Sequence, residues 1–122
     1  MRAFTTRIHG VLDYLMGALL VALPWIGGFA TGGPEQWVPV GLGAGVLAYS
    51  LVTDYELALV RKLPMPVHLW LDALGGLFLA ASPWIFGFDE QVWQPHVALG
   101  LAEVVAAMLT NTIPSYERRR VA

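Results

Sequence analysis

The sequence contains no cysteine and few charged residues. Without cysteine the chain forms no disulfide and offers no thiolate to a metal or to redox chemistry. Lys, Arg, Asp and Glu together make up 13% of the residues, against about 25% in a typical soluble domain. The seven Lys and Arg residues do not provide the basic field that nucleic-acid binding needs. The composition therefore excludes a disulfide scaffold and a nucleic-acid-binding domain.

The few charges are separated by long uncharged runs. Residues 14–34, 36–53 and 73–88 contain no Asp, Glu, Lys or Arg. A helix that crosses a bilayer needs roughly 20 mostly apolar residues. A soluble protein with an unusually apolar core is the alternative, but the run lengths favour an integral membrane protein.

An internal repeat divides the chain into two units. Residues 9–29 and 68–88 align without a gap, and twelve of the 21 positions are identical. The identical pairs are His9/His68, Leu12/Leu71, Asp13/Asp72, Leu15/Leu74, Gly17/Gly76, Leu20/Leu79, Ala22/Ala81, Pro24/Pro83, Trp25/Trp84, Ile26/Ile85, Gly28/Gly87 and Phe29/Phe88. Because the second copy lies in mid-chain, we interpret the first apolar run as a retained helix rather than a cleaved signal peptide.

The second halves of the units align more weakly, at an offset of 57 instead of 59. The matches are Leu42-Gly43 with Leu99-Gly100 and Thr53-Asp54 with Thr110-Asn111. We predict an all-α fold, an integral membrane four-helix bundle made of two tandem, parallel helical hairpins, with turns at Gly and Pro clusters. The first repeat is 1–62, with helices at about 8–27 and 37–57, and the second is 63–122, with helices at about 67–87 and 95–113.

The basic residues indicate an orientation. All seven fall at the N-terminus, in the middle linker or at the C-terminus: Arg2, Arg7, Arg61, Lys62, Arg118, Arg119 and Arg120. Four spans would place these three regions on one side of the membrane. The loops predicted on the other side carry Glu35, Asp89 and Glu90 instead. The positive-inside rule then predicts that both termini are cytoplasmic.

A proline and a tryptophan follow one another near the outer end of the first helix in each unit, as Pro24-Trp25 and Pro83-Trp84. Proline frees a backbone carbonyl, which needs another partner in lipid. Ser82 can supply one in the second unit, whereas Leu23 cannot in the first. Tryptophan suits the membrane interface. We interpret the pair as an anchor with a helix bend or stop; a ligand-binding aromatic cluster is the alternative.

The Ser82-Pro83-Trp84 motif, with two helices per unit and two units per chain, resembles the SPW repeat family of small bacterial integral membrane proteins. The first unit departs from the motif at Leu23. The resemblance covers nearly the whole chain and implies a multi-pass protein of the bacterial cytoplasmic (inner) membrane. It brings no biochemical activity and no catalytic residue.

Small residues recur four positions apart on every predicted helix, as at Gly41 and Gly45 or at Gly76 and Ala80. Helices in lipid associate by close packing at such stripes. We predict that Gly41, Gly45 and Gly76 pack helices within the bundle. The alternative is that one stripe faces a second copy of the chain or another membrane subunit.

Histidine and aspartate occur four residues apart in both units, as His9/Asp13 and His68/Asp72. This spacing places each pair on one helix face. We interpret each pair as a structural clasp at the cytoplasmic end of its helix. One alternative is a haem held between His9 and His68; another is quinone binding or proton handling by the His–Asp pairs.

Glu103 lies near the middle of the fourth predicted helix, where the first unit has Val46. A carboxyl group at that depth is neutral, paired within the bundle, or functional. We favour a structural pair with a tyrosine or histidine; transport is the alternative.

No hydrolase, nucleotide-binding or metal-binding pattern occurs in the sequence. We therefore predict a non-enzymatic scaffold or accessory subunit with no catalytic and no metal-binding residue. It would pack in the bilayer as a homo-oligomer or within a larger membrane complex. A haem- or quinone-binding electron-transfer subunit and a minimal transporter using Glu103 are the alternatives.

Overall fold

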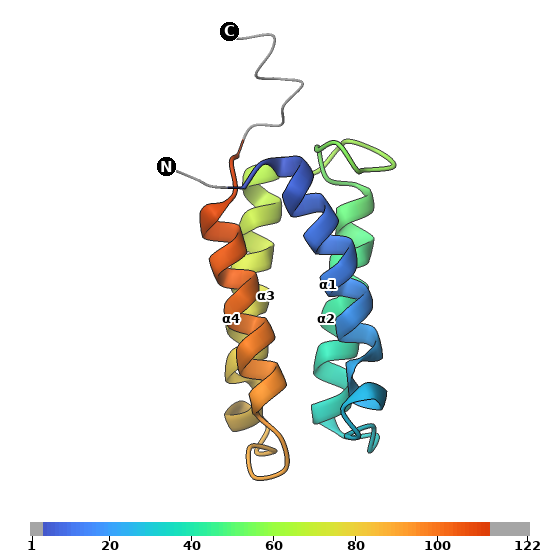
Figure 1. The fold of residues 1–122 in the computed structure, drawn as a ribbon, viewed down its shortest axis with the longest axis vertical. Coiled ribbons are helices and arrows are strands. Elements are labelled where there is room, and N and C mark those ends of the chain that lie inside the picture. Colours follow the sequence, from blue (N-terminus) through green and yellow to red (C-terminus); the bar gives the residue numbers. More distant parts are fainter. Residues whose placement is uncertain (1–3, 113–122) are drawn as a thin grey trace, which may run out of the picture.

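The structure is a computed structural model that describes residues 4–112. These residues form an all-α fold of four helices: α1 (Thr6–Ile26), α2 (Pro34–Leu51), α3 (Met65–Ile85) and α4 (Gln94–Leu109). Helices α1 and α2 pack as one hairpin, α3 and α4 as another, and the hairpins stand side by side (Figure 1). Because α1 and α3 begin at the same end of the molecule, the two hairpins run in the same direction. Four of the basic residues on which the predicted orientation depends lie outside the described residues: Arg2, Arg118, Arg119 and Arg120.

The repeated Pro-Trp-Ile-x-Gly-Phe stretch ends both α1 and α3. Gly28 and Gly87 have φ angles of 74° and 72°, in the left-handed region that glycine adopts without strain. The next residue then turns back, so that the Phe29 amide donates to the Pro24 carbonyl, and the Phe88 amide to the Pro83 carbonyl, both at 2.8 Å. This is the six-to-one bond of a Schellman cap. Each helix therefore continues past its proline and ends in the turn that contains the glycine.

Ser82 supplies the hydrogen bond that Pro83 removes. Proline has no amide hydrogen, so the carbonyl four residues earlier, that of Leu79, loses its helical donor. The Ser82 hydroxyl donates to that carbonyl at 2.6 Å. The first unit has Leu23 at the equivalent position, which has no hydroxyl.

Helices α2 and α4 end earlier than the positions near 57 and 113 that the sequence suggested. After Leu51 the chain folds back on itself, and the amides of Leu59 and Val60 both donate to the Leu51 carbonyl at 2.9 Å. After Leu109, Thr110 is extended and forms an isolated bridge with Phe4. Backbone pairing with another segment thus replaces the last helical turn in both cases.

Glycines bring the two helices of each hairpin into close contact. A methyl group built on Gly43 of α2 would lie 2.7 Å from the Gly17 carbonyl of α1. A methyl group on Gly76 of α3 would lie 2.5 Å from the Gly100 carbonyl of α4. Only glycine permits this approach.

Gly41 and Gly45, which were predicted to pack helices within the bundle, border the groove between α2 and α3 and make no close helix contact. A methyl group on either residue would meet nothing within 4 Å. Both residues lie on the side of α2 that faces away from α1, whereas Gly43 is buried between the two helices. In the run Gly41-Leu42-Gly43-Ala44-Gly45, only Gly43 points into the hairpin.

Replacing Gly76 with alanine is expected to lower the free energy of unfolding by about 1–3 kcal/mol, because the new methyl group overlaps the α4 backbone. Unfolding in detergent by heat or by denaturant titration measures the change. Gly75→Ala is the matched control, since its methyl group would lie 3.8 Å from Leu42, an ordinary contact. Equal destabilisation by both changes would contradict the packing described here.

The helices expose apolar residues and bury polar ones, the reverse of a water-soluble bundle. From Ile8 onward on α1, and throughout α2 and α3, every exposed residue is apolar or glycine. Helix α4 adds one exposed polar residue, Gln94, at its start. The buried polar side chains of the helices include His9, Asp13, Ser50, His68, Asp72, Ser82 and Glu103. Helices α1 and α3 are each long and apolar enough to cross a membrane, and α4 is a shorter apolar helix.

Candidate functional site

His9 and Asp13 of α1 meet His68 and Asp72 of α3 at the end where both helices begin. The repeat gives both helices the same four-residue spacing, so each presents one histidine and one aspartate on its inner face. One ligand atom from each of the four side chains lies within 4.8 Å of all the others. All four side chains are buried, with at most 1% of each residue exposed. We call this group the His–Asp cluster.

The shortest contacts of the cluster run between the hairpins. His9 Nε2 lies 2.6 Å from Asp72 Oδ2, and His68 Nε2 lies 2.9 Å from Asp13 Oδ2. The contacts within each helix, His9 to Asp13 and His68 to Asp72, are both 3.1 Å. The predicted pair within each helix is therefore present, and the shorter contacts join the two pairs into one cluster between the repeats.

Two threonines fix the histidine rings. His9 Nδ1 lies 2.7 Å from the Thr110 hydroxyl, and His68 Nδ1 lies 2.6 Å from the Thr53 hydroxyl. Each hydroxyl also donates to the carbonyl four residues earlier, in the last turns of the preceding helix, at 2.6 Å. A hydroxyl has one hydrogen, so its oxygen accepts from the imidazole, and Nδ1 carries a proton in both rings. The two Nε2 atoms consequently face the carboxylates.

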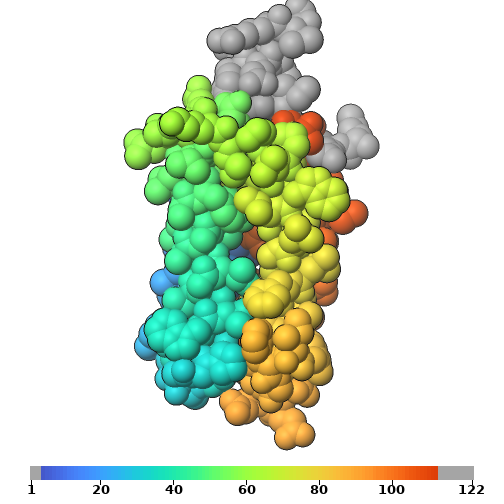
Figure 2. Space-filling view, turned by 180° about the vertical axis from the view of Figure 1, so that it is seen from behind, coloured from blue at the N-terminus to red at the C-terminus, as the bar shows by residue number. Residues whose placement is uncertain are grey.

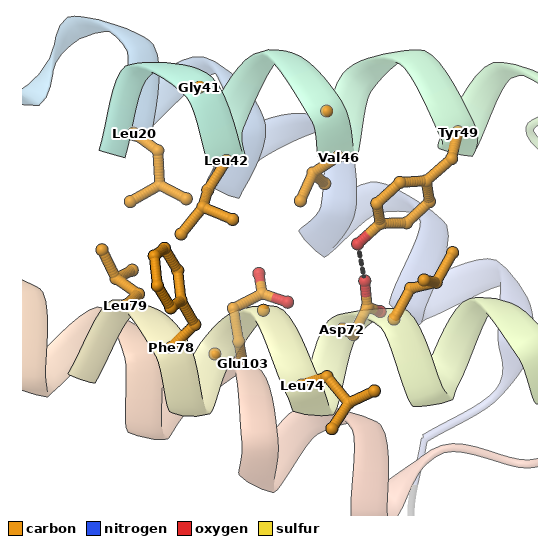
Figure 3. A pocket seen from close by; sticks show the side chains of 14 residues that line it. Leu20, Gly41, Leu42, Val46, Tyr49, Asp72, Leu74, Phe78, Leu79 and Glu103 are labelled. Carbon is orange, nitrogen blue, oxygen red and sulfur yellow. Dashed lines mark hydrogen bonds between the residues drawn. The ribbon is translucent and has the colours of Figure 1, made fainter. Parts of the chain in front are cut away.

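Two tyrosines support the aspartates. The Tyr49 hydroxyl donates to Asp72 Oδ1 (Figure 3), and the Tyr55 hydroxyl donates to Asp13 Oδ2 at 3.1 Å. Tyr55 lies in the connection between α2 and α3, where burial and then the charge of Asp13 raise the pKa of its phenol. The phenol therefore keeps its proton and remains a donor. Each of the four cluster residues thus has one supporting group from outside the cluster.

No site role was predicted for Thr53, Thr110, Tyr49 or Tyr55 from the sequence. A signal existed for the threonines, because Thr53 and Thr110 are matched by the repeat at the offset of 57. Each threonine bonds the histidine of the other unit, so the exchange is reciprocal. The tyrosines have no counterpart, since Ala106 and Thr112 stand at the matching positions.

The cluster geometry disfavours a haem between His9 and His68. The two rings lie 5.5 Å apart, centre to centre. Both carboxylates contact both Nε2 atoms at 2.6–3.1 Å, so they occupy the space that a porphyrin plane would need. A haem would have to displace both aspartates into an apolar surrounding, at the cost of a buried, unpaired charge.

Glu103 lies between two grooves that separate the hairpins. The α2–α3 groove, of about 380 Å³, is mostly apolar and reaches Tyr49 and Asp72. The α1–α4 groove, of about 370 Å³, reaches His9 and Asp13. Glu103 lines both, and its carboxyl group points into the α2–α3 groove (Figure 3). Seen from behind, α2 and α3 stand side by side, and this groove lies between them (Figure 2).

A second contact joins the hairpins at the opposite end. The phenylalanines of the two caps converge on His96 of α4, with ring centres 5.3 Å away for Phe29 and 4.9 Å away for Phe88. His96 Nε2 donates to the Glu35 carbonyl of α2 at 2.9 Å. His96 is thus a buried link between the repeats.

The tryptophans of the Pro-Trp pairs gather near this end. Trp25 and Trp84 have 59% and 54% of their surface exposed, and Trp37 and Trp93 are exposed close by. Trp84 and Trp93 lie 6.3 Å apart, centre to centre. The prolines before them, Pro24 and Pro83, are buried. The arrangement is that of four exposed aromatic rings around one end of the bundle, with no closed aromatic cage in the described residues.

A comparison with protein-family models matches residues 7–110 to the SPW repeat domain. The match includes both repeat units, the whole His–Asp cluster and both Pro-Trp pairs. The comparisons with curated proteins and with solved structures found no match. Because the family model covers most of the chain, the protein belongs to the SPW repeat domain family.

Proposed function

We propose that the protein is a non-enzymatic integral membrane protein that serves as a small scaffold or accessory subunit. The observation that carries this proposal is the reversed surface, with apolar residues exposed along the helices and polar residues buried. In water that surface would be an aggregation liability, and in lipid it is the favoured arrangement. Helix α1, with 21 residues, is about 31 Å long, which matches a hydrocarbon core of about 30 Å.

We further propose that all four helices span the cytoplasmic membrane of a bacterium, with the cluster end facing the cytoplasm. Helices α2 and α4 are shorter, about 27 and 24 Å long, and their pairing with α1 and α3 shields their polar groups. Arg7, Arg61 and Lys62 lie at the cluster end, whereas Asp89 and Glu90 lie at the tryptophan end. The positive-inside rule supports this orientation.

The exposed face of α2 supports association with a second copy of the chain. Gly41, Ala44 and Ala48 are exposed, and Gly45 lies beside them half-buried. In this stripe of small residues, Gly41 and Gly45 border the α2–α3 groove but make no close helix contact, since methyl groups on them would meet nothing within 4 Å. Two copies related by a twofold axis would place the same stripe on both sides of one interface.

Replacing Gly45 with leucine is expected to weaken self-association about tenfold or more, because a loss of about 1.4 kcal/mol suffices. The monomer has room at this position, so its fold should be kept. Sedimentation or energy transfer between labelled chains in detergent measures the association. Ala81→Leu, on the exposed face of α3, is the control. A wild-type protein that is monomeric at every concentration, or equal effects of the two changes, would contradict self-association through α2.

A quinone-binding subunit is the second candidate. The α2–α3 groove is apolar, lies on the side of the bundle and leads to the Tyr49 hydroxyl and the carboxyl groups of Asp72 and Glu103. Such a groove suits a ligand that enters from lipid. A transporter using Glu103 is a further alternative, because this buried carboxyl group lines both grooves between the hairpins. Glu103→Gln distinguishes a scaffold from a transporter, because a scaffold tolerates this change whereas a transporter that uses the carboxyl group loses transport.

A further inference from the structure

We propose that the His–Asp cluster is a binding site for one divalent transition-metal ion of the zinc class. The ligands are Nε2 of His9, Nε2 of His68 and one carboxylate oxygen each from Asp13 and Asp72. This inference goes beyond the proposed scaffold function and stands whether or not the protein associates with partners.

The four donor atoms are already gathered at the scale of a tetrahedral site. Zinc binds imidazole nitrogen and carboxylate oxygen at about 2.0–2.2 Å, which places neighbouring ligand atoms about 3.4 Å apart. The nitrogen–oxygen contacts here are 2.6–3.1 Å. These contacts use both oxygens of Asp13, and the four ligand atoms, one from each side chain, lie within 4.8 Å of one another. The approximate twofold symmetry of the repeat brings equivalent ligands from opposite sides.

The surroundings hold each ligand in the orientation that a metal requires. Metal-binding histidines almost always donate their other ring hydrogen to an acceptor, and metal-binding carboxylates are themselves hydrogen-bonded. Thr110 and Thr53 accept from the two Nδ1 atoms. Tyr49 and Tyr55 donate to the two carboxylates. All four proposed ligands thus have a hydrogen bond with a residue outside the cluster, which metal ligands typically have and a simple ion pair does not require.

His68 Nε2 supplies an independent observation. The atom is fully buried and has no hydrogen-bond partner. Asp13 and Asp72 lie 2.9 and 3.1 Å away, but not in the direction of an N–H bond from this ring. A buried donor without an acceptor is costly. Without its proton, Nε2 would be free to bind a cation shared with the two carboxylates.

Charge balance permits the ion. Without metal, two imidazolium rings would be needed to balance the two carboxylates. A divalent ion replaces one proton from each ring, both of which are released, and the cluster again has no net charge. The ion therefore adds no uncompensated charge to an apolar surrounding.

The donor set selects the class of ion. Magnesium and calcium prefer six or more oxygen ligands, and copper(I) prefers sulfur. Two imidazoles and two carboxylates, all from the protein, suit a four-coordinate ion with no open position. The bound ion would join the two hairpins and perform no reaction.

The test uses the full chain purified in a mild detergent, stripped with a chelator and then offered Zn²⁺. We expect one zinc per chain by elemental analysis and by native mass spectrometry. Co²⁺, used as a spectroscopic probe on the unaltered protein, should give the intense visible absorption of tetrahedral cobalt. No stoichiometric zinc, or the weak spectrum of octahedral cobalt, would overturn the proposal.

Two variants separate coordination from nonspecific binding. Thr53→Val keeps all four ligands but removes the acceptor of His68 Nδ1, and should weaken zinc binding about 10- to 100-fold. His96→Gln removes a buried histidine that lies outside the cluster and should leave zinc binding unchanged. If His96→Gln weakened zinc binding more than Thr53→Val did, the proposal would be overturned.

Discussion

Replacing Asp72 with asparagine is expected to lower the free energy of unfolding by about 3–5 kcal/mol, because the change leaves an uncompensated positive charge in a buried site. Asparagine has nearly the same shape, so the loss reflects charge rather than volume. Asp72 contacts both histidines and accepts from Tyr49, and it is 1% exposed. The expectation holds whether two protons or a divalent ion balance the carboxylates. Denaturant titration in detergent measures the change.

Glu90→Gln provides the comparison for Asp72→Asn. It also removes one carboxylate, but from an exposed position in the turn between α3 and α4. A surface change of this kind is expected to stay within about 0.5 kcal/mol of the wild type. If Asp72→Asn fell in the same range, the His–Asp cluster would not hold the two hairpins together.

Replacing Leu77 with arginine is expected to prevent stable membrane insertion. Leu77 is 52% exposed and lies near the middle of α3. On the surface of a soluble protein such a change costs little. At the centre of a membrane helix arginine costs about 2.5–3.5 kcal/mol. The amount of protein that resists alkaline extraction from membranes measures the effect.

Leu59→Arg is the matched change outside the bilayer. Leu59 is 80% exposed and lies in the connection between α2 and α3, close to Arg61 and Lys62. An added positive charge there agrees with the proposed cytoplasmic side and should leave insertion unchanged. Equal amounts of the Leu77→Arg and Leu59→Arg proteins in the membrane would indicate that the exposed face of α3 meets water.

The four helices could be predicted from the sequence because their signals are local. Uncharged runs, the glycine and proline turns and the repeat are all visible within short segments. The early ends of α2 and α4 were not predictable, since they depend on backbone pairing with residues distant in the chain, such as Phe4 with Thr110.

The candidate site was predicted in part. The spacing of His9 and Asp13 identified the residues, but it suggested a partner on the same helix. Whether the nearer aspartate is Asp13 or Asp72 depends on how the hairpins approach each other, which no local pattern encodes. The repeat matches Thr53 with Thr110, but no local pattern shows that each hydroxyl reaches the histidine of the other unit.

The repeat distinguishes the glycines that make close helix contacts from those that do not. Gly17 and Gly76 match each other, as do Gly43 and Gly100. These four make the close contacts within the hairpins. Gly41 and Gly45 have Ala98 and Ala102 at the matching positions and make no close helix contact. Within the helices, a glycine at matching positions of both units therefore marks a close contact between two helices. Where one unit has glycine and the other has alanine, no such contact is made.

Single cysteines provide the most direct test of the central claim, an inside-out membrane bundle with parallel hairpins, because the natural chain has none. The measurement is labelling of Glu90→Cys, Leu59→Cys and Leu77→Cys by a membrane-impermeant maleimide. We expect Glu90→Cys to react in spheroplasts, Leu59→Cys only in inverted vesicles, and Leu77→Cys in neither. Reaction of both loop positions from the same side, or of Leu77→Cys as fast as Leu59→Cys, would contradict the claim.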